Sequence, residues 1–172
     1  HEWSESSRFE VIANYMNSPT ADDPGGVDLE TFMTSPRSAR DRNLQFIAGE
    51  AVSQFKGSLR YSGQVSDRVN LVSYGFYSGR DFVGRLPFEN SGMIELQRDF
   101  LGHGTSLTVD LFEGQTTWKS LVGYEISAQL DDRSRFDNLD GEQGARVLFQ
   151  DEQFYNAGFY MINDVNRDNF TF

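Results

Sequence analysis

The connections between the predicted strands alternate between very short and long. The short ones cover residues 64–67, 112–116 and 164–167, and the long polar ones cover 16–50, 80–91 and 132–150. Tight turns on one side of a wall and large loops on the other are typical of β-barrels of outer membranes. A soluble sandwich or propeller has no physical reason to sort its loops in this way. The pattern therefore predicts an all-β antiparallel transmembrane barrel wall, with short periplasmic turns and long extracellular loops.

The composition agrees with a barrel wall that contacts water on one face. Hydrophobic residues make up 38% of the 172 residues and aromatic residues 14%, and such an aromatic-rich, aliphatic-poor mixture favours strands. The net charge of −11 argues against a nucleic-acid partner, which requires clustered Lys and Arg. The absence of cysteine argues against a disulfide scaffold or a cysteine metal site. No stretch approaches the ~18 apolar residues of a transmembrane helix, so a membrane role requires a barrel.

Alternation between apolar and polar residues predicts about seven strands. They cover 8–15, 51–63, 68–80, 91–111, 117–131 and 150–163, and the last begins near 168. Within 51–63, Phe55, Leu59 and Tyr61 point one way while Lys56 and Arg60 point the other, which suits a water-filled lumen. In 68–80, apolar residues occupy both faces and the outside is not assigned. These seven strands, an odd number, have no closing partner, so we expect a section of a larger wall. Within the first long loop, Asp28 is expected to cap a short helix over 29–33.

The apolar faces of these strands give the lipid-facing candidates. They are Phe55, Leu59, Tyr61, Trp118, Val122, Tyr124, Ile126, Tyr155 and Phe159. Trp118 follows a short turn, where an aromatic girdle is expected.

Several strings suggest a family. They are NYMNSPTADDPGG (14–26), RNLQFIAGEAVSQFKGSLRY (42–61), GFYSGRDFVGRLPF (75–88), RDFLGHGTSLT (98–108) and LVGYEISAQLDDRSRFDNLDGEQG (121–144). Taken in order, they resemble the barrel region of TonB-dependent outer-membrane receptors, in particular the ferric-siderophore type. The resemblance implies a 22-stranded barrel with an N-terminal plug, which imports a scarce ligand in a Gram-negative outer membrane. Residues 1–172 are expected to be a partial barrel domain without the plug, and no TonB box is recognised.

This resemblance implies partners and a ligand surface. The partners are a ferric siderophore or similar ligand, the TonB energy-transducing complex acting through the missing plug, and outer-membrane lipid with lipopolysaccharide. The ligand-binding candidates at the predicted outer rim are Arg80, Asp81, Arg85, Arg133, Arg135 and Tyr77, because arginines and aromatic rings capture anionic chelates through charge-assisted bonds and stacking. The alternative for each arginine is neutralisation of loop acids or contact with lipopolysaccharide phosphates.

Catalysis, cofactors and metals are not expected. His103 lies between Gly102 and Gly104, where a bend or bulge is the preferred interpretation. Four loop acids, Asp131, Asp132, Asp137 and Asp140, offer calcium ligands, but alternating arginines favour a solvated or salt-bridged loop. The chain is therefore not expected to be an enzyme. Two alternatives stay open: a soluble all-β carbohydrate-binding module, and a small complete barrel for adhesion, which needs an even strand count.

Overall fold

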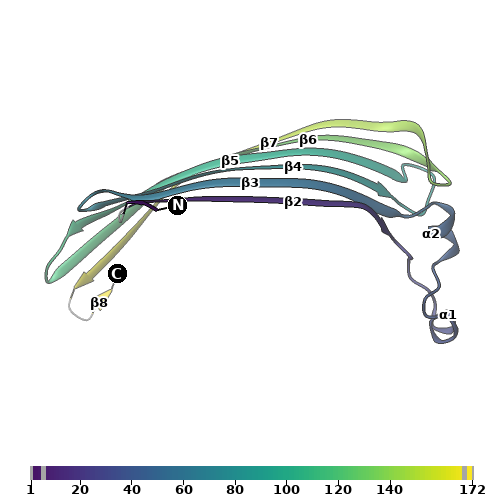
Figure 1. Ribbon diagram of the computed structural model, residues 1–172, viewed down its shortest axis with the longest axis horizontal. Helices are drawn as coiled ribbons and strands as arrows, with labels where there is room; N and C mark the ends of the chain where they lie inside the picture. Colours follow the sequence, from purple (N-terminus) through teal and green to yellow (C-terminus); the bar gives the residue numbers. More distant parts are fainter. Residues whose placement is uncertain (1, 5–6, 168–169, 172) are drawn as a thin grey trace.

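The described strands form one antiparallel sheet in which each strand pairs with the next along the chain. The computed structural model describes residues 2–4, 7–167 and 170–171. The strands are β1 (Glu2–Ser4), β2 (Ser7–Asp22), β3 (Gly49–Ser66), β4 (Val69–Arg85), β5 (Met93–Phe112), β6 (Thr116–Leu139), β7 (Glu142–Arg167) and β8 (Phe170–Thr171). Six of these strands are long, β2 to β7, and Figure 1 shows them side by side as a curved meander. The all-β prediction is confirmed, and the predicted start of the last strand, near 168, lies outside the described residues.

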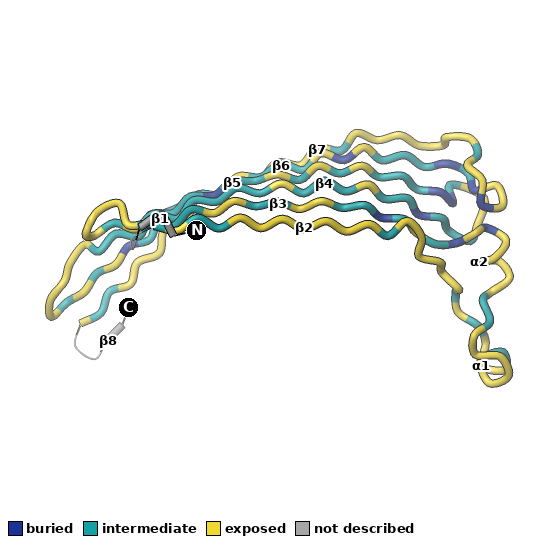
Figure 2. Tube along the Cα trace, viewed as in Figure 1, coloured by how far each residue is buried: buried dark blue, intermediate teal, exposed yellow. Residues whose placement is uncertain are grey.

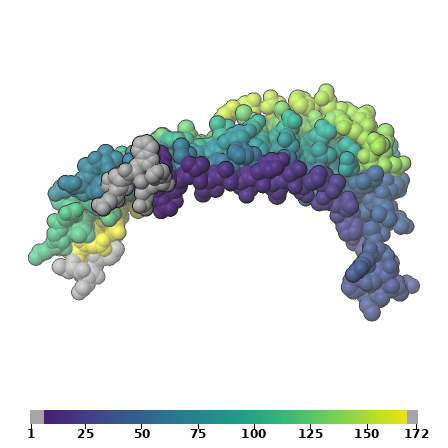
Figure 3. All heavy atoms as spheres, in the orientation of Figure 1, coloured from purple at the N-terminus to yellow at the C-terminus, as the bar shows by residue number. Residues whose placement is uncertain are grey.

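The connections at one end of the sheet are short, whereas two of the three at the other end are longer. The turn end carries the tight connections 67–68 and 113–115, while the loop end carries 23–48, 86–92 and 140–141. The 23–48 connection contains α1 (Leu29–Thr34) and α2 (Asp41–Gln45) and projects from the loop end, as Figures 1 and 3 show. Asp28 caps α1 by accepting a hydrogen bond from the Thr31 amide at 2.7 Å, so the predicted cap is confirmed. Neither helix in the described part of the chain is long or apolar enough to cross a membrane.

The predicted long loop at 132–150 was wrong. Residues 132–139 continue β6 and 142–150 belong to β7, so the two strands reach 24 and 26 residues. Only Asp140 and Gly141 form the turn, with φ of 51° and 96°. Two consecutive residues with positive φ are the geometry of a tight hairpin turn, for which Asp-Gly is a preferred pair. Residues 80–85 likewise belong to β4 rather than to a loop.

Strand register sorts the side chains onto two faces. One row of directly opposed residues runs Phe9, Tyr61, Ser73, Thr105, Tyr124 and Phe159, and the adjacent row on this face runs Val11, Leu59, Gly75, His103, Ile126 and Ala157. We call this side the apolar face. The rows in between, such as Glu10–Arg60–Tyr74–Gly104–Glu125–Gly158, define the polar face. In β4 the register also settles the assignment that sequence left open, because Tyr77 lies on the apolar face while Tyr74 and Phe76 lie on the polar one.

The glycines beside His103 make room for rings rather than forming a bulge. Pairing of β5 with β4 and β6 continues without a register shift through 102–104, so the predicted bend there was wrong. A Cβ added at Gly102 would lie 2.5 Å from the Phe76 ring, and one at Gly104 would lie 2.7 Å from the Tyr74 ring. His103 itself lies on the apolar face, within hydrogen-bond distance of Ser73 and Tyr124 at 3.2 Å each.

Most buried hydrophobic side chains gather at the loop end. Phe46, Ala48, Val52, Met93 and Phe136 are each at most 9% exposed, whereas Phe159 in the middle of the apolar face is 85% exposed. Figure 2 shows the buried segments concentrated beside α2, at the end opposite the termini. A single-layer sheet has no second layer to bury its faces, so this cluster is the main apolar core of the described residues.

Candidate functional site

Every ion pair among the described residues lies on the polar face. The five pairs are Arg8–Glu10, Arg60–Glu10, Arg98–Asp131, Lys119–Asp110 and Arg133–Glu152. Charges of both signs therefore line one surface of the sheet from near the turn end to the loop end. Such a surface requires water or a polar partner, because unpaired charge and polar backbone are costly to place in an apolar medium.

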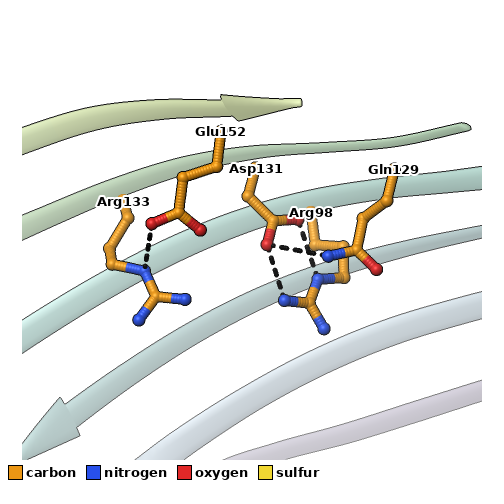
Figure 4. Close-up of polar contacts among 5 residues, drawn as sticks. All are labelled: Arg98, Gln129, Asp131, Arg133 and Glu152. Carbon is orange, nitrogen blue, oxygen red and sulfur yellow. Dashed lines mark hydrogen bonds and ion pairs between the residues drawn. The ribbon is translucent and has the colours of Figure 1, made fainter. Parts of the chain in front are cut away.

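Asp131 makes the best-buried of these contacts (Figure 4). Its two carboxylate oxygens accept hydrogen bonds from Nε and Nη2 of Arg98 at 2.8 and 2.6 Å, and Oδ2 also accepts one from Gln129 Nε2 at 3.1 Å. The residue is only 2% exposed. The Arg98 guanidinium holds the pKa of the Asp131 carboxyl below its ordinary value, and burial opposes this shift. A bidentate pair of this kind fixes both side chains in orientation.

Cross-strand position explains why the pair forms. Arg98 in β5 is directly opposite Asp131 in β6 and directly opposite Arg80 in β4. Arg133 then pairs with Glu152 of β7 at 3.3 Å, as Figure 4 shows. Toward β6 and β7, Arg98 and Arg133 are each paired with a carboxylate. Toward β4, Arg80 lies directly opposite Arg98 with no carboxylate between them.

The six predicted ligand residues do not form one surface. Arg80, Arg133 and Arg135 lie on the polar face, whereas Tyr77, Asp81 and Arg85 lie on the opposite one. All six belong to strands β4 and β6 rather than to loops. The guanidinium of Arg80 lies over the Phe82 ring at 5.3 Å, and the hydroxyl of Tyr77 donates to Asp99. Their role in ligand binding stays a prediction.

The nine predicted lipid-facing residues all share the apolar face. On β5 and β7 the mostly apolar stretch of this face covers 101–111 and 155–165, with His103, Thr105 and Asn163 as its polar members. Its length is close to the ~9–11 residues that a tilted strand needs to span a bilayer. We call this stretch the belt. At its turn end Trp118 stacks on Phe112 with ring centroids 6.0 Å apart. Beyond its loop end the same face becomes acidic, with Asp81, Asp132 and Asp151 in one row. The belt therefore has a sharp boundary at each end.

Sequence reasoning missed a buried asparagine that joins three connections at the loop end. Asn138 is 0% exposed, and its Nδ2 donates to the carbonyls of Phe46 and Leu86 at 3.0 and 3.1 Å. Its Oδ1 accepts from the Gly141 amide at 2.7 Å, and its own amide donates to the Glu89 carbonyl at 2.8 Å. The nearby Asp140-Gly141 turn signal was visible in the sequence, but the partners of Asn138 depend on tertiary contacts that alternation does not reveal.

No group of three or more His, Asp or Glu side chains in the described ranges is arranged to hold a metal ion. The loop acids that were considered as calcium ligands have separate partners in the hairpin. Asp131 pairs with Arg98, Asp137 accepts from the Ser91 amide at 3.1 Å, and Asp140 accepts from Gln45 at 2.9 Å.

Comparison with solved structures identifies the class of fold. No protein-family model matches the sequence, and no curated protein is detectably similar to it. The chain does resemble the ferric citrate transporter FecA in its unliganded form, with a TM-score of 0.72 and 16% sequence identity. The match covers 98% of this chain and 26% of that one, so the chain spans about a quarter of the transporter's length. The fold is that of a section of an antiparallel β-barrel wall, as predicted.

Proposed function

We propose that the chain is part of the wall of a TonB-dependent outer-membrane transporter. The observation that carries this proposal is the division of one sheet into an apolar belt of bilayer-spanning length and a face that bears all the described ion pairs. Lipid would cover the first face, and a water-filled or plug-filled lumen would meet the second. The likeness to a ferric citrate transporter supports the class and not the ligand.

The cargo is proposed to be a ferric siderophore or a similar scarce chelate. Arg80, Arg133 and Arg135 are the candidates for contact with the ligand or with a plug, because they lie on the face assigned to the lumen. Tyr77, Asp81 and Arg85 lie on the other face, near the loop-end boundary of the belt, and are proposed to meet lipopolysaccharide. In this arrangement residues 1–172 form a partial barrel domain, and strands beyond them complete the closure.

A soluble carbohydrate-binding sandwich is disfavoured by one observation. Such a fold requires two sheets with their apolar faces packed together. The described strands form one sheet, and its apolar face is open.

The test is uptake in cells that express the full-length protein containing this segment. Deletion of its gene is expected to reduce accumulation of a ⁵⁵Fe-labelled siderophore under iron limitation, and complementation to restore it only when TonB is present. The deletion strain should be screened with hydroxamate, catecholate and citrate chelates of iron. Fractionation of cells should place the protein in the outer membrane. Recovery of the folded protein in the soluble fraction would refute the proposal.

A further inference from the structure

A pocket of about 610 Å³ lies on the polar face over β2 to β6, near the loop-end boundary of the belt. Three of its lining residues are cationic: Lys56, Arg80 and Arg98. Neutral amides contribute as well, from Asn14, Gln54 and Gln129. The pocket is therefore rich in hydrogen-bond donors, and none of its described lining residues carries a carboxylate.

Two of these three cations have no counter-ion among the described residues. Arg98 is neutralised by Asp131, whose oxygens are engaged by Arg98 and Gln129. Lys56 and Arg80 form no ion pair in the described part of the chain, and the buried Nε of Arg80 has no hydrogen-bond partner there. Lys56 is directly opposite Ser78, so Arg80 is its diagonal neighbour on β4. Two neighbouring uncompensated cations in a concave surface attract an anion.

The floor of the same pocket is aromatic. Phe76 and Phe100 both line it, and their ring centroids lie 5.1 Å apart with a tilt of 56°. A small inorganic anion would satisfy the cations but leave these rings in contact with water. A carboxylate attached to an apolar body would satisfy the cations and cover the rings as well.

We propose that this pocket is a binding site for a carboxylate attached to an apolar or aromatic group. Lys56 and Arg80 bind the carboxylate, and Phe76 and Phe100 contact the apolar group. This inference rests on the proposed function, which places the polar face inside a barrel. Two sources of this chemistry are compatible with that location. One is a free organic acid in the lumen, and the other is an Asp or Glu side chain of the same protein packed inside the barrel.

The first experiment measures binding of 4-fluorobenzoate to the full-length protein in detergent by ¹⁹F NMR. For a free-acid site, 4-fluorobenzoate is expected to bind and the neutral 4-fluorobenzamide is not. The double variant Lys56→Gln/Arg80→Gln should weaken binding at least tenfold, and binding to the native protein should weaken as salt is raised. Lys119→Gln is the matched control, because Lys119 lies on the same face but outside the pocket, 3.4 Å from Asp110. It is expected to bind like the native protein.

The second experiment distinguishes the two sources with a water-soluble carbodiimide, which couples a carboxylate to an amine that it contacts. Peptide mapping is expected to find Lys56 joined either to added 4-fluorobenzoate or to an Asp or Glu of the protein itself. In the second case 4-fluorobenzoate should bind only weakly, because the site is already filled. Either product on Lys56 supports the proposal.

Two results would overturn it. One is 4-fluorobenzoate binding that is unchanged in the double variant or equalled by the benzamide. The other is the absence of both binding and any Lys56 adduct. The comparison of acid with amide uses the native protein, so it stands even if a variant fails to fold. Failure of the proposed transport function would show as iron uptake that gene deletion leaves unchanged, or as a soluble location of the protein. Neither result depends on these binding measurements.

Discussion

Asp131 carries a formal charge and is almost completely buried. Its contribution to the stability of the fold therefore depends on its ion pair with Arg98. Removing one partner of a buried pair leaves an uncompensated charge and costs about 3 kcal/mol at the lower end of the measured range. We expect Asp131→Asn to lower the free energy of unfolding by about that amount, since Arg98 keeps some contact with water. Urea unfolding of the refolded barrel in lipid vesicles measures it. Asp132→Asn is the control, because Asp132 is exposed on the other face and forms no described ion pair.

The same residue gives a pH dependence of known sign. The pKa of Asp131 is lower in the folded protein than its ordinary value of about 3.9. Its stabilising contribution is therefore fully present above about pH 4 and is lost as the pH falls through the lower folded pKa. The stability difference between the native protein and Asp131→Asn should stay constant from pH 7 to about 4 and shrink below that. A difference that shrinks already between pH 7 and 5 would contradict the assignment.

Gly102 and Gly158 form a matched pair for testing the ring contacts. Both lie on the polar face, but a Cβ at Gly102 meets the Phe76 ring and the Ile126 carbonyl oxygen, whereas one at Gly158 meets nothing within 4 Å. We expect Gly102→Ala to destabilise the barrel by about 1–3 kcal/mol through overpacking. Gly158→Ala should be neutral or slightly stabilising, because alanine restricts the unfolded chain. Equal effects of the two substitutions, measured by urea unfolding, would argue against the packing account.

Among the elements, the tip of the β6–β7 hairpin is joined to the 23–48 and 86–92 connections by the buried side chain of Asn138. Asn138→Ala removes a side chain that serves the Phe46 and Leu86 carbonyls and the Gly141 amide. Each buried group left unpaired costs about 1–3 kcal/mol, so we expect a total near 3 kcal/mol. Hydrogen exchange should accelerate at Gly141, in the hairpin tip. Asn90→Ala is the control, since Asn90 is exposed in the 86–92 connection.

The strands also show which parts of the fold the apolar–polar alternation of the sequence can predict. Residues 54–61 alternate, and their two faces were grouped correctly because Phe55, Leu59 and Tyr61 share one side while Gln54, Lys56 and Arg60 share the other. Residues 132–150 were missed because beyond the belt neither face needs to be apolar, so a paired strand there has the composition of a loop. The register that brings Arg98 to Asp131 depends on turns and bulges, which alternation does not encode.

At the scale of the whole molecule, the division into two faces predicts opposite outcomes for adjacent residues. Ile126 lies on the apolar face and Ser127 on the polar face of the same strand. We expect Ile126→Arg to cost roughly 2–4 kcal/mol in a bilayer if the position lies near the midplane. Ser127→Arg, its neighbour and control, should cost much less because it meets water or a polar partner. Folding into vesicles, followed by gel mobility with and without heating, measures both. A larger defect in Ser127→Arg would reverse the assignment of the two faces.

The position of the apolar core has a further consequence for the opening of the proposed barrel. Phe46, Met93 and Phe136 are buried at the loop end, outside the belt. Asn138 joins the connections 23–48, 86–92 and 140–141 at the same end. The spacing between these strand ends is thus fixed by protein packing rather than by the lateral pressure of surrounding lipids. This arc of the entrance should keep one width when the bilayer is thinned, stretched or replaced by detergent.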